Sequence, residues 1–214
     1  MLEARDLKFT FKEGATKLDF PDIECSRGEQ WLLLGQSGSG KTTLLHLLGG
    51  LRRLDSGTIL IDGQDISTMR ESRLDSFRGR NIGIIFQQSH FLRALTVKEN
   101  LRLGQTLAGL PVDDDRIVAI LKRLGIVDKA DSRPHRLSVG EQQRASICRA
   151  LVNRPKLILA DEPTSALDDD HCEEVISLLR EQAAAEQITL LIVTHDNRLK
   201  SVFEKSIELK PQLI

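Results

Sequence analysis

A glycine-rich stretch is the part of this sequence most able to do chemistry. An apolar run, Trp31 to Leu34, precedes it and another, Leu44 to Leu48, follows it, which predicts a strand, a loop and a helix. In that setting the spacing Gly, four residues, Gly-Lys-Thr is typical of a phosphate-binding loop. The loop consists of Gly35, Gln36, Ser37, Gly38, Ser39, Gly40, Lys41 and Thr42, and Thr43 follows it.

The residue types of this loop suit a triphosphate. Its glycines let the backbone N–H groups converge with the helix N-terminus on an anion. Lys41 supplies a mobile cation for the outer phosphates, and the Thr42 hydroxyl is placed to ligate Mg²⁺. The alternative is a glycine-rich turn with a capping hydroxyl, which does not require every fixed position to match.

Two acidic residues end a buried strand later in the chain. Leu157 to Ala160 is apolar, and Asp161 and Glu162 follow it. Ligands bind at the carboxyl ends of strands in open parallel sheets. If this strand neighbours the phosphate-loop strand, Asp161 can hold Mg²⁺ through water and Glu162 can polarise the attacking water. The alternative is a pair of solvated strand-end carboxylates.

A third segment begins a helix. Ser138 and Glu141 have the spacing of a capping box, in which each side chain bonds to the other residue's backbone. Any helix can begin this way. A serine at a helix N-terminus with Gly140 beside it also makes an anion site, however, so a contact with phosphate stays open.

Composition limits the class of protein. The 214 residues can bury one good-sized core, and 30 Lys and Arg nearly cancel 31 Asp and Glu. This balance argues against a nucleic-acid binder. No apolar run approaches the roughly 18 to 20 residues of a membrane span, and the N-terminus lacks a signal-peptide core, so a membrane role needs a partner. Three well-separated cysteines predict reduced thiols in a cytosol: Cys25, Cys148 and Cys172.

The order of elements predicts an α/β fold. Leu2–Phe11 and Leu18–Cys25 are expected to form an antiparallel hairpin beside the main sheet, and helical character extends over residues 88–153. Strands that alternate with helices predict a mostly parallel sheet covered on both sides. The other expected elements are a strand at Gly57–Gly63 ending in a hairpin turn, a short helix at Arg70–Phe77, a helix at Asp168–Ala185, and strands at Asn81–Phe86, Ile188–Thr194 and Lys205–Leu209.

Six segments in order resemble the ATP-binding subunit of an ATP-binding-cassette (ABC) transporter. They are the phosphate loop, Phe86-Gln87, Leu137 to Arg144, Leu157 to Glu162, Ser165 to Asp168, and Thr194-His195-Asp196. The residue sequence from His46 to Leu51 is similar to that of the bacterial lipoprotein-releasing, macrolide-exporting and cell-division members of this family. The resemblance implies a P-loop NTPase of the ABC type with an N-terminal antiparallel β subdomain. It also implies one domain over residues 1–214, with its core at about 1–87 and 154–214 and a helical subdomain at about 88–153.

The resemblance implies catalytic and binding roles. Phe11 takes the place of the adenine-stacking aromatic, although a strand-core residue is the alternative. Gln87 would reach Mg²⁺ and the attacking water, and His195 would hydrogen-bond the γ-phosphate. The expected ATP contacts are Phe11, Gly35 through Thr43, Gln87 and His195; the expected catalytic residues are Lys41, Gln87, Glu162 and His195; the expected Mg²⁺ ligands are Thr42, Gln87 and Asp161.

The resemblance also implies a dimer, formed by two copies or with a related ATPase when ATP is bound. The signature residues Ser138, Val139, Gly140 and Glu141 would close over the partner's ATP, and Ser165, Ala166, Leu167 and Asp168 would form a dimer loop. Val139 and Glu141 depart from the usual Leu-Ser-Gly-Gly-Gln. Because a carboxylate near a triphosphate is repelled, we expect Glu141 to fold back onto the N–H of Ser138 as a cap.

Separate integral membrane subunits would dock near Gln87 to Arg93, at the cytoplasmic face of a bacterial inner membrane. Phe91 and Leu92 either offer an apolar anchor there or pack inside the helical segment. Two rival readings stay open. One is an ABC ATPase acting on nucleic acid or ribosomes, which the charge balance disfavours, and the other drives a mechanical or signalling change in a membrane partner without transport.

Overall fold

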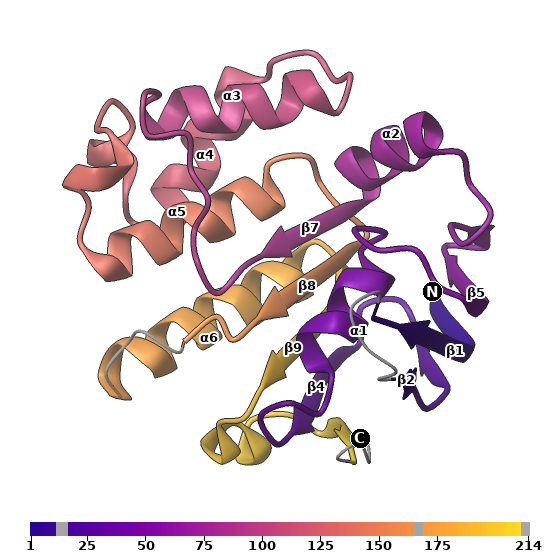
Figure 1. Ribbon diagram of the computed structural model, residues 1–214. Helices are drawn as coiled ribbons and strands as arrows, with labels where there is room; N and C mark the ends of the chain where they lie inside the picture. The colour runs from indigo at the N-terminus through magenta and orange to yellow at the C-terminus, as the bar shows by residue number, and fades with distance from the viewer. Residues whose placement is uncertain (12–16, 165–168, 211–214) are drawn as a thin grey trace.

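A five-stranded parallel sheet forms the centre of the computed structural model, which describes residues 1–11, 17–164 and 169–210 (Figure 1). All of its strand pairs run parallel, in the order β10-β4-β9-β8-β7. The predicted mostly parallel sheet is therefore confirmed. Its strands are β4 (Gln30–Gly35), β7 (Ile82–Ile85), β8 (Leu157–Asp161), β9 (Thr189–Thr194) and β10 (Lys205–Leu209).

A second sheet is antiparallel. It comprises β1 (Leu2–Thr10), β2 (Lys17–Asp19), β3 (Ile23–Cys25), β5 (Ser56–Ile61) and β6 (Gln64–Asp65). The predicted strand over residues 18–25 is divided, and both of its parts, β2 and β3, pair with β1. Pro21 lies in the break, where the missing N–H prevents a continuous ladder. Asp62 and Gly63 both have positive φ, 51° and 74°, as a two-residue hairpin between β5 and β6 requires.

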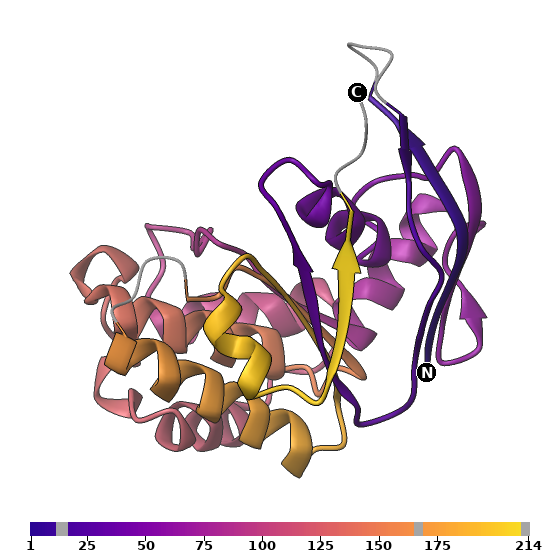
Figure 2. The ribbon, with the colours of Figure 1, turned by 90° about the horizontal axis from the view of Figure 1, so that it is seen from below.

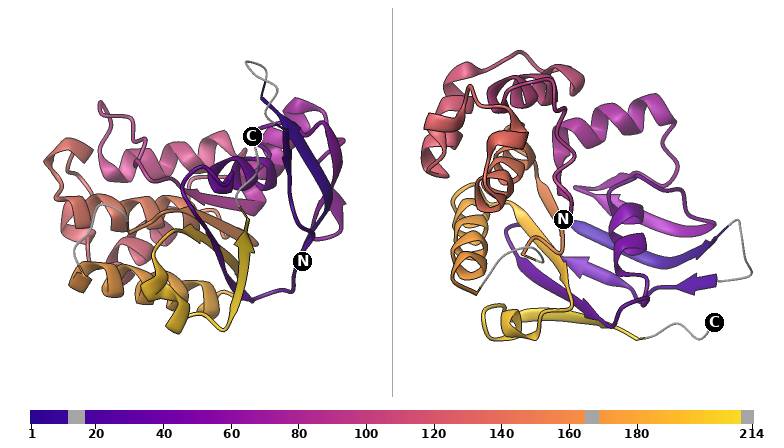
Figure 3. Two further views of the ribbon diagram at one scale, coloured as in Figure 1. Left: turned by 60° about the horizontal axis from the view of Figure 1, so that its bottom comes forward. Right: turned by 60° about the vertical axis from the view of Figure 1, so that its left-hand side comes forward.

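The helices fall into two groups. The ones outside the connection from β7 to β8 are α1 (Lys41–Leu48), α2 (Glu71–Asn81) and α6 (Asp169–Ala185). Between β7 and β8 the chain forms α3 (Val97–Leu107), α4 (Asp114–Arg123) and α5 (Val139–Leu151), with short 3₁₀ turns at Val127–Lys129 and Pro134–Arg136; a third lies at Asn197–Ser201. Figure 3 shows α3, α4 and α5 gathered on one side of the molecule, away from the antiparallel strands.

Helix α2 runs four residues beyond the predicted end at Phe77. A glycine and three polar residues follow Phe77, and the next strand was expected to begin with the last of them, Asn81. In the structure a Cβ on Gly79 would lie 3.0 Å from Cα of Ala108, at the end of α3. The glycine is needed for this close approach of two helices, and packing extends the helix past the end of the apolar pattern.

Alternating side chains of the parallel strands divide the core into two clusters. One face carries Leu32, Ile158 and Ile192, which pack toward α6 and the helical segment between β7 and β8, including α5. The other face carries Leu33, Leu159 and Leu191, which pack toward α1 and the antiparallel sheet. Figure 2 shows α1 lying between the antiparallel strands and the parallel sheet. Since strand side chains alternate with period two, both faces of the sheet bury apolar surface, and the sheet is fixed relative to both layers.

Candidate nucleotide site

The glycine-rich loop connects the end of β4 to the start of α1, as predicted. Gly38 and Gly40 have φ of 79° and 87°, in the region that side-chain-bearing residues rarely adopt. A Cβ on Gly35 would lie 2.5 Å from Oγ of Ser39 and 3.0 Å from the carbonyl oxygen of Leu209. The three glycines are therefore required by backbone conformation and by close packing, and the loop presents its N–H groups next to the helix N-terminus.

Lys41 begins α1 and is only 7% exposed. Its Nζ donates to the carbonyl oxygens of Gly35 at 2.8 Å and of Gln36 at 2.9 Å. An ammonium group has three donors, so these two bonds fix the cation inside the loop and leave one donor for an incoming anion. The loop thus holds its positive charge in place before any phosphate binds.

Asp161 lies at the end of β8 and is 6% exposed. Burial raises the pKa of its carboxyl group, and a hydrogen bond from the side chain of Thr42 opposes that rise. Among the described residues its Oδ1 has no hydrogen-bond partner. A buried carboxylate oxygen without a donor, beside a hydroxyl, is a suitable pair of hard oxygen ligands for Mg²⁺ or for the water that hydrates it.

The sequence analysis assigned Asp161 to Mg²⁺ on the condition that its strand neighbours the phosphate-loop strand, and the structure does not meet that condition. Strand β8 is not a neighbour of β4, because β9 lies between them. Asp161 still reaches Thr42, since α1 packs across β9 onto β8 and brings its first turn with it. The carboxylate and the hydroxyl therefore meet through a helix crossing and not through strand pairing.

Glu162 is the side chain on which the polar groups converge. Its Oε1 lies 2.8 Å from Nδ1 of His195, and its Oε2 accepts from Nε2 of Gln87 at 3.5 Å. Its φ is 45°, an uncommon value for a residue other than glycine, and its N–H donates to the carbonyl oxygen of Val193 at 2.8 Å. Strained backbone of this kind occurs at functional sites, where the surrounding structure maintains it.

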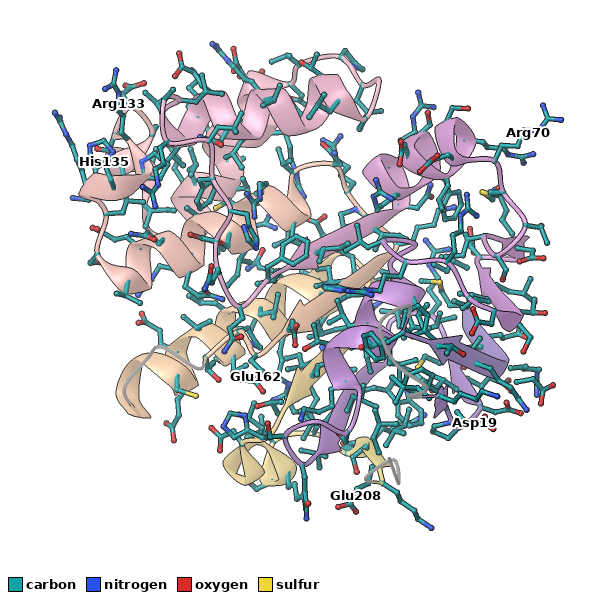
Figure 4. The ribbon with its side chains drawn as sticks, in the orientation of Figure 1. Asp19, Arg70, Arg133, His135, Glu162 and Glu208 are labelled. Carbon is teal, nitrogen blue, oxygen red and sulfur yellow. The ribbon has the colours of Figure 1, made fainter. Side chains whose placement is uncertain are left out.

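One cavity of about 620 Å³ contains most of the predicted site. It is open at the C-terminal ends of the parallel strands, where Figure 4 places Glu162. Its lining includes phosphate-loop residues, the polar side chains Gln87, Glu162 and His195, and the apolar side chains Phe11 and Leu18. A phosphate loop, apolar side chains and a carboxylate in one cavity fit a nucleotide that is bound at its base and attacked at its terminal phosphate.

The predicted signature residues lie apart from this cavity, at the start of α5. Ser138 N donates to Oε2 of Glu141 at 2.8 Å, and Glu141 N donates to Oγ of Ser138 at 3.3 Å. The predicted capping box is confirmed, and Nζ of Lys129 lies 3.4 Å from the other oxygen of Glu141. The hydrogen bond from Ser138 N lowers the pKa of Glu141. Val139 is 55% exposed, with its side chain outside the cap.

Comparison with known proteins gives these features a family. A family model described as ABC transporter matches residues 18–165. The putative hemin import ATP-binding protein HrtA of Staphylococcus aureus (strain MRSA252) is 40% identical over 214 residues, which cover 98% of this chain and 96% of HrtA. The chain belongs to the ABC transporter family.

Two further comparisons extend the match. The macrolide export ATP-binding/permease protein MacB of Vibrio parahaemolyticus is 39% identical over 98% of this chain, which spans only 33% of the length of MacB. A dimeric post-hydrolysis structure of the ATP-binding cassette MJ0796 bound to ADP and Pi has a TM-score of 0.89 and 32% identity, covering 99% of this chain and 95% of that one. The predicted ABC ATPase, its fold class and its dimeric family architecture are confirmed.

The predicted docking segment of this ABC cassette connects β7 to α3. Phe91 is half-buried against the helical core cluster, with the guanidinium carbon of Arg149 4.5 Å from its ring centroid. Leu92 is 52% exposed. Each of the two predicted alternatives therefore applies to one side chain. Phe91 packs inside the helical segment, and Leu92 lies on the surface, where an apolar anchor would be. Within residues 1–11, 17–164 and 169–210 no helix combines the length and apolar character of a membrane span.

Sequence reasoning missed some residues of the site. Leu18 lines the cavity beside Phe11, and Arg149 donates to the carbonyl oxygen of His90 at 2.9 Å and so holds the docking segment against α5. Neither residue belongs to a motif, and only their positions in the fold identify them. The predicted dimer loop, Ser165 to Asp168, lies outside the described residues.

Proposed function

We propose that this chain binds Mg²⁺ and ATP in the cavity at the phosphate loop and hydrolyses the terminal phosphate. Lys41 and the loop N–H groups hold the phosphates, and Phe11 stacks on the adenine. Thr42, Gln87 and Asp161 hold the cation, which would neutralise charge on the phosphates. The arrangement of Glu162 carries the proposal: its carboxylate lies between His195 and Gln87 and lines the same cavity as Lys41.

Glu162 acts as the group that polarises the attacking water. A carboxylate accepts a proton only while it is ionised and within reach of the water. His195 bonds to one oxygen of Glu162 and fixes the direction of the other, which is the one near Gln87. Gln87 offers an amide that can contact both the water and the cation, so both of its predicted roles are compatible with one position.

The proposal extends to assembly. Ser138 to Glu141 lie outside the chain's own cavity, so a second cassette arranged head to tail would bring its α5 cap over the first cassette's ATP. Residues 165–168 would form the dimer loop. Hydrolysis would then be transmitted through Gln87 to Arg93 to separate membrane subunits at the cytoplasmic face of a bacterial inner membrane. The exposed Leu92 offers those subunits an apolar contact.

Glu162→Gln tests the proposal. The variant keeps the shape of the side chain but cannot accept a proton, so we expect ATP affinity to remain within a few-fold and the turnover rate to fall about 100- to 1,000-fold. Gel filtration with light scattering should show a dimer that persists in ATP. The control is Glu71→Gln, at an exposed position beside Arg70 on the far edge of the molecule in Figure 4. Normal turnover by Glu162→Gln would overturn the assignment.

A further inference from the structure

Phe11, a predicted ATP contact, forms a compact group with two side chains that belong to no sequence motif, Phe9 and Arg52. The rings of Phe9 and Phe11 meet edge to face, with centroids 5.0 Å apart at 88°. The guanidinium carbon of Arg52 lies 5.6 Å from the Phe9 centroid and 5.7 Å from the Phe11 centroid. Both distances are within the range in which a cation is attracted to an aromatic ring.

Arg52 contacts Phe11 without being part of the cavity lining. Phe11 lines the 620 Å³ cavity, whereas neither Phe9 nor Arg52 does. No carboxylate among the described residues forms an ion pair with Arg52. Among the described residues, its guanidinium lies against the two aromatic rings, and one of these rings, Phe11, lines the cavity.

The backbone of Arg52 is attached to the helix that begins at the phosphate loop. The N–H groups of Leu51 and Arg52 both donate to the carbonyl oxygen of His46, at 2.8 and 3.2 Å. His46 belongs to α1, whose first residues are Lys41 and Thr42. One short helix thus connects the phosphate-binding groups at its start to the arginine that supports the aromatic ring beyond its end.

We propose that Arg52 is a positioning residue for the adenine base, acting through Phe11. This inference rests on the proposed stacking of adenine on Phe11. The guanidinium restrains the Phe11 ring and withdraws electron density from it, which favours stacking of a purine on that ring. Arg52 contributes to recognition of the base and not to recognition of the phosphates.

The test compares a ligand that has a base with one that lacks it. ATP and inorganic tripolyphosphate, each with Mg²⁺, are titrated into the purified chain, and the ratio of their dissociation constants is recorded. Arg52→Ala should weaken ATP binding about two- to fivefold and leave tripolyphosphate binding unchanged. Arg52→Lys keeps the charge but loses the planar guanidinium group. Its ratio of dissociation constants should therefore lie between those of the unaltered chain and Arg52→Ala.

Arg53→Ala is the matched control. Arg53 is exposed like Arg52, but its NH1 donates to the carbonyl oxygen of Ser67 at 3.4 Å. Its ratio should equal that of the unaltered chain. The inference is overturned if Arg52→Ala weakens both ligands equally or behaves like Arg53→Ala. Circular dichroism spectra establish whether each variant is folded. If Arg52→Ala is not folded, the comparison is made with Arg52→Lys instead.

Phe11→Ala distinguishes failure of the inference from failure of the base assignment. If Phe11→Ala lowers the preference for ATP and Arg52→Ala does not, Phe11 binds the base without help from Arg52. If Phe11→Ala leaves the ratio unchanged, the stacking assignment and the inference built on it both fail, while the Glu162→Gln result continues to test hydrolysis on its own.

Discussion

Arg116 and Glu186 form an ion pair that connects the helical segment to the chain after α6. The guanidinium is bidentate, with NH1 to Oε1 and NH2 to Oε2 both at 2.8 Å, and NH2 also donates to the carbonyl oxygen of Leu151 at 3.0 Å. The side chains are 10% and 19% exposed. Because both charges are mostly removed from water, loss of one partner should be costly.

The two single substitutions should differ in size. In Arg116→Met, Glu186 keeps a second cation, Arg123, at 3.4 Å, so we expect a loss of about 2 kcal/mol in the free energy of unfolding. In Glu186→Leu, Arg116 stays mostly buried with only the Leu151 carbonyl oxygen as its acceptor, so we expect a loss of about 3 to 4 kcal/mol. The double variant removes both charges and should lie within about 1 kcal/mol of the unaltered chain.

Urea titration followed by circular dichroism measures these differences. A loss of 3 kcal/mol should lower the midpoint by about 1 M for a chain of this size. The control is Arg102→Met, which breaks a bidentate pair with Asp114 of similar geometry, at 2.8 and 2.6 Å, but with side chains 42% and 45% exposed. Its midpoint should stay close to that of the unaltered chain. Equal shifts for Glu186→Leu and Arg102→Met would refute the argument from burial, as would additive losses in the double variant.

Two other predictions follow from the ionised carboxylates of Glu141 and Glu29. Glu141→Gln retains an acceptor for the helix cap, so ATP affinity should change by less than about threefold; much tighter binding in an equilibrium titration would show instead that the carboxylate faces the phosphates. A hydrogen bond from Lys205 is the main cause that lowers the pKa of Glu29 from 4.5 to about 2. The ionised form of Glu29 therefore stabilises the fold above about pH 4.5, and this contribution is lost as the pH falls toward 2. The urea midpoints of the unaltered chain and Glu29→Gln should therefore differ at pH 7 and converge over that interval, and parallel pH curves would contradict the assignment.

Local patterns account for what could be predicted from the sequence. The phosphate loop, the capping box at Ser138 and the apolar strands each depend on residues within a few positions of one another, so spacing alone identifies them. The hairpin at Asp62-Gly63 is of the same kind. The break at Pro21 was open to the same local reasoning, because proline lacks an N–H, whereas the extension of α2 past Phe77 was missed because it depends on packing against the end of α3.

Only the tertiary structure decided which distant groups meet. Asp161 contacts Thr42 although a strand separates β8 from β4, because a helix crosses over that strand. Phe91 is half-buried while its neighbour Leu92 is exposed, and Arg52 lies against Phe11. A side chain's type fixes which interactions it is able to make, and the sequence determined that much. Which of those interactions form depends on chain crossings and packing between segments far apart in sequence, which no local pattern encodes.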